Sequence, residues 1–252
     1  MNLSISSLAW QANDLERSLA TLKRFGVSRI EGVFTKIDTW EKINRTIVSD
    51  FCDRIATWSI TMPSIQSIFY GSGLKTFADE QAVSNHLRKV CELAHVSKSK
   101  IIVLGAPSLR KPNTRHCLTN SLASVSKDLV DLGIKLCIEP NSRVYGGDYY
   151  CELGEICEFV RNCKIDGICA MLDTHNLELE GYDPLCEYVE YMDCIQHIHI
   201  SSKNLEPIND FSRYKIFAKE LKRSYNGLVT YELSDSKDFE NHVLQFVDVF
   251  SN

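Results

Sequence analysis

The stretch GICAMLDTHN, residues 167–176, carries the pattern on which the fold of this chain depends. Five apolar or small residues run from a glycine up to Asp173, and a polar group follows at once. A short apolar run that is bounded by glycine and a polar turn is typical of a buried β-strand. Because an unpaired carboxylate is costly to bury, a strand that ends in this way is expected to place its charge at the edge of the sheet.

Three other apolar runs in the second half of the chain end in the same way. They cover residues 134–138, 195–200 and 228–231, and they carry Glu139, His199 and Glu232 at or next to their ends. Successive runs are about thirty residues apart, the length of one strand and helix unit. If the strands are parallel neighbours, the four polar side chains converge on one rim.

The whole chain repeats this alternation eight times. The expected strands cover residues 3–10, 29–35, 59–69, 100–106, 134–139, 167–173, 194–201 and 228–233. Segments with helical periodicity lie between and after them, at residues 15–25, 43–55, 83–94, 118–132, 156–160, 185–192, 217–221 and 239–250. Eight strand and helix pairs with right-handed crossovers predict one domain, a (β/α)8 TIM barrel over residues 1–252. An open doubly wound sheet is the alternative, but no glycine-rich phosphate loop follows the first strand.

Composition limits the partners and the compartment. The 252 residues carry a formal net charge of -5, which argues against a nucleic-acid partner held by phosphate contacts. The first seventeen residues have no basic segment and no long apolar segment, so we expect a cytoplasmic protein without a membrane partner. Ten cysteines without any C-x-x-C pair are expected to be reduced core residues. A homo-oligomer is compatible with the sequence.

Three carboxylates and an imidazole on one rim would repel one another without a cation, and this predicts a divalent metal site. Each residue also has a structural alternative. Glu139 is also placed to pair with a nearby arginine such as Arg143, and Asp173 is also suited to cap a helix or a turn. His197 and His199 alternate on one run and so share a face; His199, nearer the carboxyl end, is the better ligand, and His197 is placed to orient it.

Six side chains on or near the expected rim are candidates for substrate contacts. Arg110 and Lys203 follow strands and are suited to hold an anion, although surface solvation is the default for such residues. The six candidates are Gln66, Arg110, His175, Asn176, His197 and Lys203.

These segments together resemble the xylose isomerase-like TIM-barrel superfamily, in its sugar-phosphate isomerase/epimerase branch. The resemblance is carried by CIEPN at 137–141, MLDTHN at 171–176, HIHIS at 197–201 and TYEL at 230–233, and more weakly by IEG at 30–32, QSIFYG at 66–71 and LGAP at 104–107. It implies that Glu139, Asp173, His199 and Glu232 coordinate one divalent metal ion, most often Mn²⁺, with Zn²⁺, Co²⁺ or Mg²⁺ as alternatives. Two departures, Asn176 and the pair Ser201 and Ser202, concern substrate contacts.

The resemblance implies a small-molecule sugar or polyol substrate, free or phosphorylated, and an isomerase or epimerase reaction in carbohydrate metabolism. Glu139 and Glu232 would be the acid/base pair that moves a proton next to a metal-chelated carbonyl. A dehydratase on the same site is an alternative, and a non-enzymatic metabolite-binding barrel is another. An endonuclease IV-like activity is disfavoured, because Gln66 and the segment 105–107 stand where that group has histidines.

Overall fold

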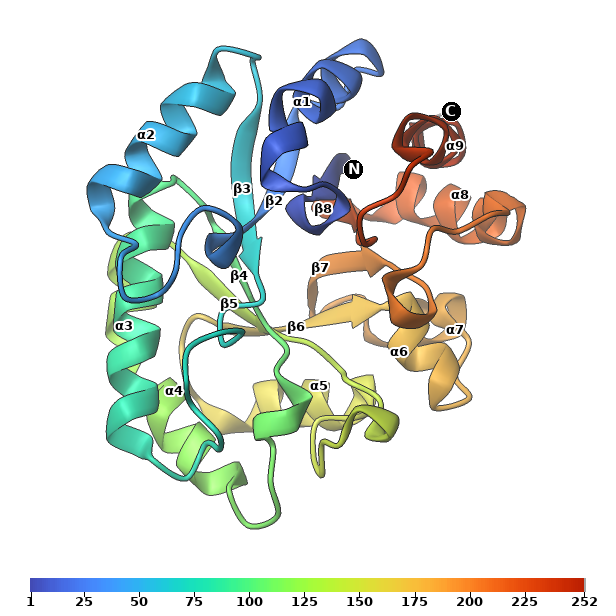
Figure 1. Ribbon diagram of the computed structural model, residues 1–252. Helices are drawn as coiled ribbons and strands as arrows, with labels where there is room; N and C mark the ends of the chain where they lie inside the picture. The colour runs from blue at the N-terminus through green and yellow to red at the C-terminus, as the bar shows by residue number, and fades with distance from the viewer. Residues whose placement is uncertain (252) are drawn as a thin grey trace.

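The computed structural model describes residues 1–251, and its eight strands form one closed parallel barrel (Figure 1). Each strand pairs with its neighbours in sequence, and β1 closes the barrel against β8. The expected single-domain (β/α)8 barrel is confirmed. The strands are β1 Asn2–Ser6, β2 Arg29–Val33, β3 Thr61–Gln66, β4 Ile101–Leu104, β5 Lys135–Ile138, β6 Ile168–Asp173, β7 Ile195–Ile200 and β8 Leu228–Tyr231.

Helices surround the strands on all sides (Figure 1). All eight expected helical segments are present in the described residues, and one further short helix, α6, follows β6 directly. The helices are α1 Leu15–Arg24, α2 Arg45–Ala56, α3 Glu80–Val96, α4 Arg115–Leu132, α5 Leu153–Cys163, α6 Thr174–Leu179, α7 Pro184–Tyr191, α8 Lys215–Ser224 and α9 Phe239–Ser251.

Helix α6 was not among the eight expected helical segments. Asp173 caps it, since the side-chain Oδ1 of Asp173 accepts a hydrogen bond of 2.7 Å from the backbone N–H of Asn176. Six residues are too few for the helical periodicity that marked the other eight segments. The capping role that the sequence offered as the alternative for Asp173 is therefore present.

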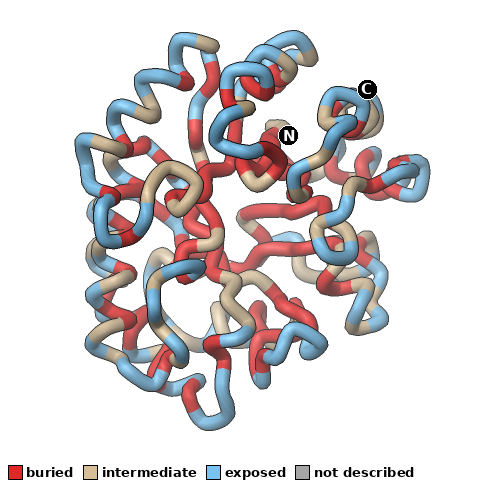
Figure 2. The backbone as a smooth tube through the Cα atoms, in the orientation of Figure 1, coloured by how far each residue is buried: buried red, intermediate tan, exposed pale blue. Residues whose placement is uncertain are grey.

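The main core lies between the strands and the surrounding helices. Outward-facing strand residues such as Ile5, Ile30, Ile198 and Tyr231 are fully buried there against the apolar faces of the helices. Figure 2 shows the strands as mostly buried, and most of the exposed residues lie on the outer helix faces and the loops. Because these apolar residues pack against the helices, the alternate residues of each strand face the barrel interior.

The barrel interior is more polar than this outer core. Ser4, Glu31, Ser64, His197 and Thr230 are all fully buried, and they alternate along their strands with the outward apolar residues. A smaller apolar cluster that includes Val103, Cys137 and Met171 fills another part of the chain's interior. The polar residues lie below the strand ends that carry the candidate ligands, a placement that matters for the site.

All ten cysteines are free thiols, and six of them are buried. This agrees with the expectation of reduced core residues. In the described part of the chain, no helix combines the length with the apolar character that crossing a membrane requires.

Candidate metal centre at the barrel mouth

The four residues expected to converge do so. One ligand atom from each of Glu139, Asp173, His199 and Glu232 lies within 4.8 Å of the ligand atoms of the other three. They come from the ends of β5, β6, β7 and β8, which are neighbours in the closed sheet. Asp173 and His199 are almost fully buried, while the carboxylates of Glu139 and Glu232 are slightly more accessible.

The Nδ1 atom of His199 faces the three carboxylates. It lies 3.4 Å from Oε2 of Glu232, 3.7 Å from Oε1 of Glu139 and 3.9 Å from Oδ2 of Asp173. Donor atoms that share one metal ion at about 2.1 Å are separated by roughly 3.0 to 4.2 Å, depending on the coordination geometry. The spacing therefore fits a divalent cation placed between these side chains.

The protonation of the cluster also fits a cation site. Burial, followed by the charges of Glu139 and Glu232, raises the pKa of Asp173 to about 8. Burial also raises the pKa of Glu232. Burial opposes the charged form of His199, but the carboxylates of Glu31 and Glu232 outweigh it and raise the pKa of this imidazole. Without a cation the cluster thus holds protons to limit its negative charge.

Gly105 leaves the room that Glu139 occupies. A Cβ atom at Gly105, which follows β4, would clash with Oε2 of Glu139. The carboxylate of Glu139 therefore lies against backbone at the end of the neighbouring strand. A glycine is required here by close approach and not by an unusual backbone angle.

A further carboxylate, Glu31 on β2, contacts His199 from below. Oε1 of Glu31 lies 2.7 Å from Nε2 of His199, and Oε2 lies 2.6 Å from Nε2 of His197. These are close contacts between a carboxylate and two imidazoles, but the N–H directions of both rings miss the oxygens by too much for either contact to count as a hydrogen bond. The sequence placed Glu31 only within a weak family match at residues 30–32; an acidic residue inside an otherwise apolar strand was the available signal.

The mouth contains two cavities that meet at the glutamates. The first, about 420 Å³, lies over the ends of β3 and β4 and is lined by Gln66, Tyr70 and Lys75 among others. The second, about 350 Å³, lies over the ends of β5 to β7 and includes Tyr145. Glu139 and Glu232 line both cavities, so they form the boundary between them.

Solved structures share this architecture. A structure of D-psicose 3-epimerase in the presence of D-fructose matches with a TM-score of 0.77 and 15% identity, over 100% of both chains. An AP endonuclease of family 2 from Brucella melitensis gives a TM-score of 0.78 at 15% identity, over 98% of this chain and 99% of that one. A probable 3-DHS dehydratase from Bacillus anthracis gives 0.69 at 13% identity, over 100% of this chain and 99% of that one.

The chain shares the (β/α)8 TIM-barrel fold of these solved structures. At these identities the likeness concerns the fold alone. No protein-family model matches the sequence, and no curated protein matches it either.

Three of the expected substrate contacts lie at the mouth of the barrel. Gln66 lines the first cavity, and its Nε2 donates to Oγ of Ser6 at 2.8 Å. His175 and Asn176 line the second cavity. The Nε2 atom of His175 is buried without a hydrogen-bond partner, whereas Oδ1 of Asn176 accepts from the backbone N–H of Ser142 at 3.1 Å.

Arg110 corrects the expectation of an anion-binding residue at the mouth. It is fully buried, and its guanidinium donates to the backbone carbonyl oxygens of Leu104, Gly105, Glu139 and Tyr150 at 2.8 to 3.1 Å. The side chain therefore ties together the ends of β4 and β5 and the loop before α5. No sequence pattern indicated that Arg110 is buried, because its partners are backbone carbonyl groups, two of them on segments 29 and 40 residues away.

The other two candidates do not line either cavity. His197 is fully buried one layer below His199 and contacts Glu31. Lys203 is exposed on the 3-10 helix η6 Lys203–Leu205.

Tyr145 was not expected from the sequence. It lies on the 3-10 helix η5 Arg143–Tyr145, lines the second cavity and is partly exposed. The same cavity is lined by Asp173 and Glu232, and burial, followed by the charge of Asp173, raises the pKa of the Tyr145 hydroxyl. An exposed loop aromatic carries no periodic signal that would have marked it.

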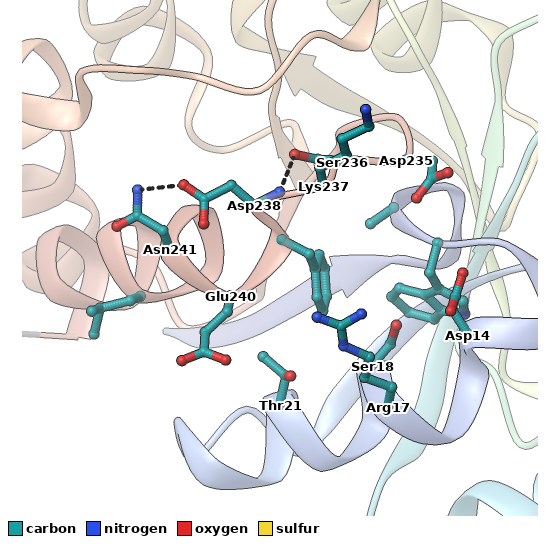
Figure 3. A pocket seen from close by; sticks show the side chains of 14 residues that line it. Asp14, Arg17, Ser18, Thr21, Asp235, Ser236, Lys237, Asp238, Glu240 and Asn241 are labelled. Carbon is teal, nitrogen blue, oxygen red and sulfur yellow. Dashed lines mark hydrogen bonds between the residues drawn. The ribbon is translucent and has the colours of Figure 1, made fainter.

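Another hollow, of about 830 Å³, lies away from the four candidate ligands. It separates α1 from the segment that leads into α9, and Figure 3 shows Asp14 and Arg17 on one wall and Lys237, Asp238 and Glu240 on the other. Its charges are mixed, and none of the candidate ligands reaches it. A third group of potential ligands, Glu80, His116 and Cys117, lies at the starts of α3 and α4, where helix dipoles disfavour a cation.

Proposed function

We propose that this protein is a metal-dependent isomerase or epimerase of a sugar or sugar phosphate. The observation that carries the proposal is the double role of Glu139 and Glu232. They belong to the four-residue cluster that fits a cation, and they also border both cavities of the mouth. A substrate placed across the two cavities would therefore lie between two carboxylates.

Glu139, Asp173, His199 and Glu232 would hold one divalent cation, with Mn²⁺ expected and Zn²⁺, Co²⁺ or Mg²⁺ as alternatives, since oxygen-rich sites with one imidazole suit such ions. When bound, the cation supplies Lewis-acid polarisation of a carbonyl and acidifies the neighbouring C–H. Glu139 or Glu232 then takes that proton, and the other glutamate returns a proton to the same or the adjacent carbon. The proton count is unchanged over one turnover.

The second cavity is lined mainly by neutral polar groups, and this supports a polyhydroxylated substrate. His175, Asn141, Ser202 and Asn204 offer donors and acceptors that match hydroxyl groups, and Tyr145 provides an aromatic wall. The first cavity has Lys75 as a charged group. Because the Lys75 ammonium group could pair with a phosphate, phosphorylated sugars should be tested together with free sugars.

A dehydratase would use the same cluster and the same proton abstraction, followed by loss of a neighbouring hydroxyl as water. Because a probable 3-DHS dehydratase has a similar fold, the experiment below also looks for a dehydrated product. An endonuclease is less favoured, because Gln66 and Gly105 stand at the ends of β3 and β4 and the net charge is -5.

The test is solvent exchange with the metal-loaded protein. Free and phosphorylated ketoses and aldoses are incubated in D₂O, and NMR reads deuterium at the carbon next to the carbonyl. We expect exchange and an isomerised or epimerised product for at least one sugar, and none with Glu139→Gln or Glu232→Gln. A product lacking the mass of water would instead identify a dehydratase. Exchange that persists in the double Gln variant would refute the acid/base assignment.

A further inference from the structure

We propose that Glu31 is a positioning residue that holds His199 with Nδ1 turned toward the carboxylate cluster. The inference rests on the proposed metal site, but it concerns how one ligand is oriented and not which sugar is used. The two contacts of Glu31 with His197 and His199, at 2.6 and 2.7 Å, carry it.

The orientation follows from the lone pairs of the imidazole. Nε2 of His199 lies 2.7 Å from an oxygen of Glu31. Two lone pairs would repel more strongly at this distance than at the 3.4 Å between Nδ1 and the nearest carboxylate oxygen of the cluster, so the hydrogen of the neutral ring is favoured on Nε2. The lone pair is then on Nδ1, which faces Glu139, Asp173 and Glu232. A cation binds a histidine only through a nitrogen that has its lone pair free.

His197 holds the second oxygen of Glu31. Its Nε2 lies 2.6 Å from Oε2, and the rings of His197 and His199 pack edge to face with centroids 4.9 Å apart. All three side chains are fully buried. Because both oxygens of Glu31 are engaged, the carboxylate has one orientation, and it transmits that orientation to His199.

The carboxylate form of Glu31 is supported by its surroundings. Each of its two oxygens faces the Nε2 atom of one imidazole, at 2.6 Å for His197 and 2.7 Å for His199. A neutral amide at the same place would offer a donor to one of the two N–H groups and would leave that N–H without an acceptor. Glu31→Gln therefore changes the hydrogen-bonding pattern while keeping the size of the side chain.

The first measurement is the affinity of the purified protein for Mn²⁺, by competition with a chromophoric chelator and without any sugar. Loss of a partner that orients a metal-binding histidine typically weakens binding about 10- to 100-fold, and we expect a loss in this range for Glu31→Gln. Thr230→Val is the matched control, because it alters a buried polar residue of the barrel interior and keeps its shape. It should retain the affinity of the wild type.

Urea unfolding of the metal-free variants separates positioning from general destabilisation. If Glu31→Gln bound Mn²⁺ as tightly as the wild type, or if Thr230→Val lost as much affinity at equal stability, the inference would be overturned.

The second measurement reads the tautomer of His199 directly, from long-range ¹H–¹⁵N correlations. In the zinc-loaded protein we expect the proton on Nε2; a proton on Nδ1 would overturn the inference. If the wild type binds no metal, the proposed function fails, and the same spectrum of the metal-free protein at alkaline pH still decides this inference.

Discussion

His199 joins two sets of buried charges. Its Nδ1 atom faces the three carboxylates of the mouth, and its Nε2 atom contacts Glu31 in the barrel interior. Without a cation, protonation of the cluster limits the repulsion, which is why the pKa of Asp173 and that of His199 are both raised. A bound cation would replace those protons, so metal binding and proton release should be coupled.

We predict that the metal-free protein loses stability as the pH rises toward 8. The pKa of Asp173 is about 8 in the folded chain and 3.8 in the unfolded reference, so folding takes up a proton between these values. This contribution to the free energy of unfolding is fully present below pH 3.8 and is lost as the pH rises through about 8. Urea unfolding at a series of pH values measures it.

Asp173→Asn removes the titrating group and should flatten this part of the pH dependence. An equal slope in the variant would show that Asp173 is not the group responsible.

The four candidate ligands could be predicted from the sequence, because each lies at or next to the end of an apolar strand segment. Glu31 and Tyr145 could not be recognised in this way, because neither lies at the end of an apolar strand segment. Glu31 lies within its strand, so its partners His197 and His199 are known only once the barrel closes. Tyr145 lies on a loop whose path over the cluster depends on tertiary contacts.

The backbone that follows β4 lies against the carboxylate of Glu139. Gly105 provides the space for its carboxylate. We predict that Gly105→Ala displaces Glu139 and weakens both Mn²⁺ binding and any sugar exchange by at least about 10-fold, the loss that follows when a supporting contact of a ligand is removed. Gly147→Ala is the control, because its Cβ would meet Pro107 at ordinary contact distances of 3.4 Å or more. Equal metal affinity in the two variants would refute the steric argument.

Arg110 holds the strand ends and loops around the mouth in place. We predict that Arg110→Met lowers the free energy of unfolding by at least about 2 kcal/mol, because each buried carbonyl left without a donor costs about 1 to 3 kcal/mol. Urea unfolding measures this, with the half-exposed Arg88→Met as the control. A change within about 0.5 kcal/mol, the range of ordinary surface substitutions, would contradict the role.

Elements with a repeated pattern were predictable, and elements fixed by capping or by backbone contacts were not. The eight longer helices each show an apolar face, and each strand overlaps an expected strand segment, although it is shorter than that segment. Helix α6 begins at the cap that Asp173 supplies and is too short for periodicity. The burial of Arg110 depends on carbonyl groups contributed by three segments of the chain.

At the scale of the whole molecule, barrel closure brings together strand ends that lie far apart in the sequence. Glu139 and Glu232 directly follow β5 and β8, yet both belong to one cluster and border the same two cavities. Parallel order in a closed sheet is sufficient for this, since every strand delivers its carboxyl end to the same face. The eight alternations of strand and helix therefore predicted the barrel, and the positions of the four candidate ligands at strand ends predicted that these side chains lie close together.

We propose that these four side chains hold one divalent metal ion at the mouth of the barrel. An anomalous difference map from crystals of the protein grown with Mn²⁺ tests this proposal. We expect one strong peak bonded to Nδ1 of His199 and to carboxylate oxygens of Glu139, Asp173 and Glu232. No peak between these side chains, or a peak bonded to Nε2 of His199, would contradict it.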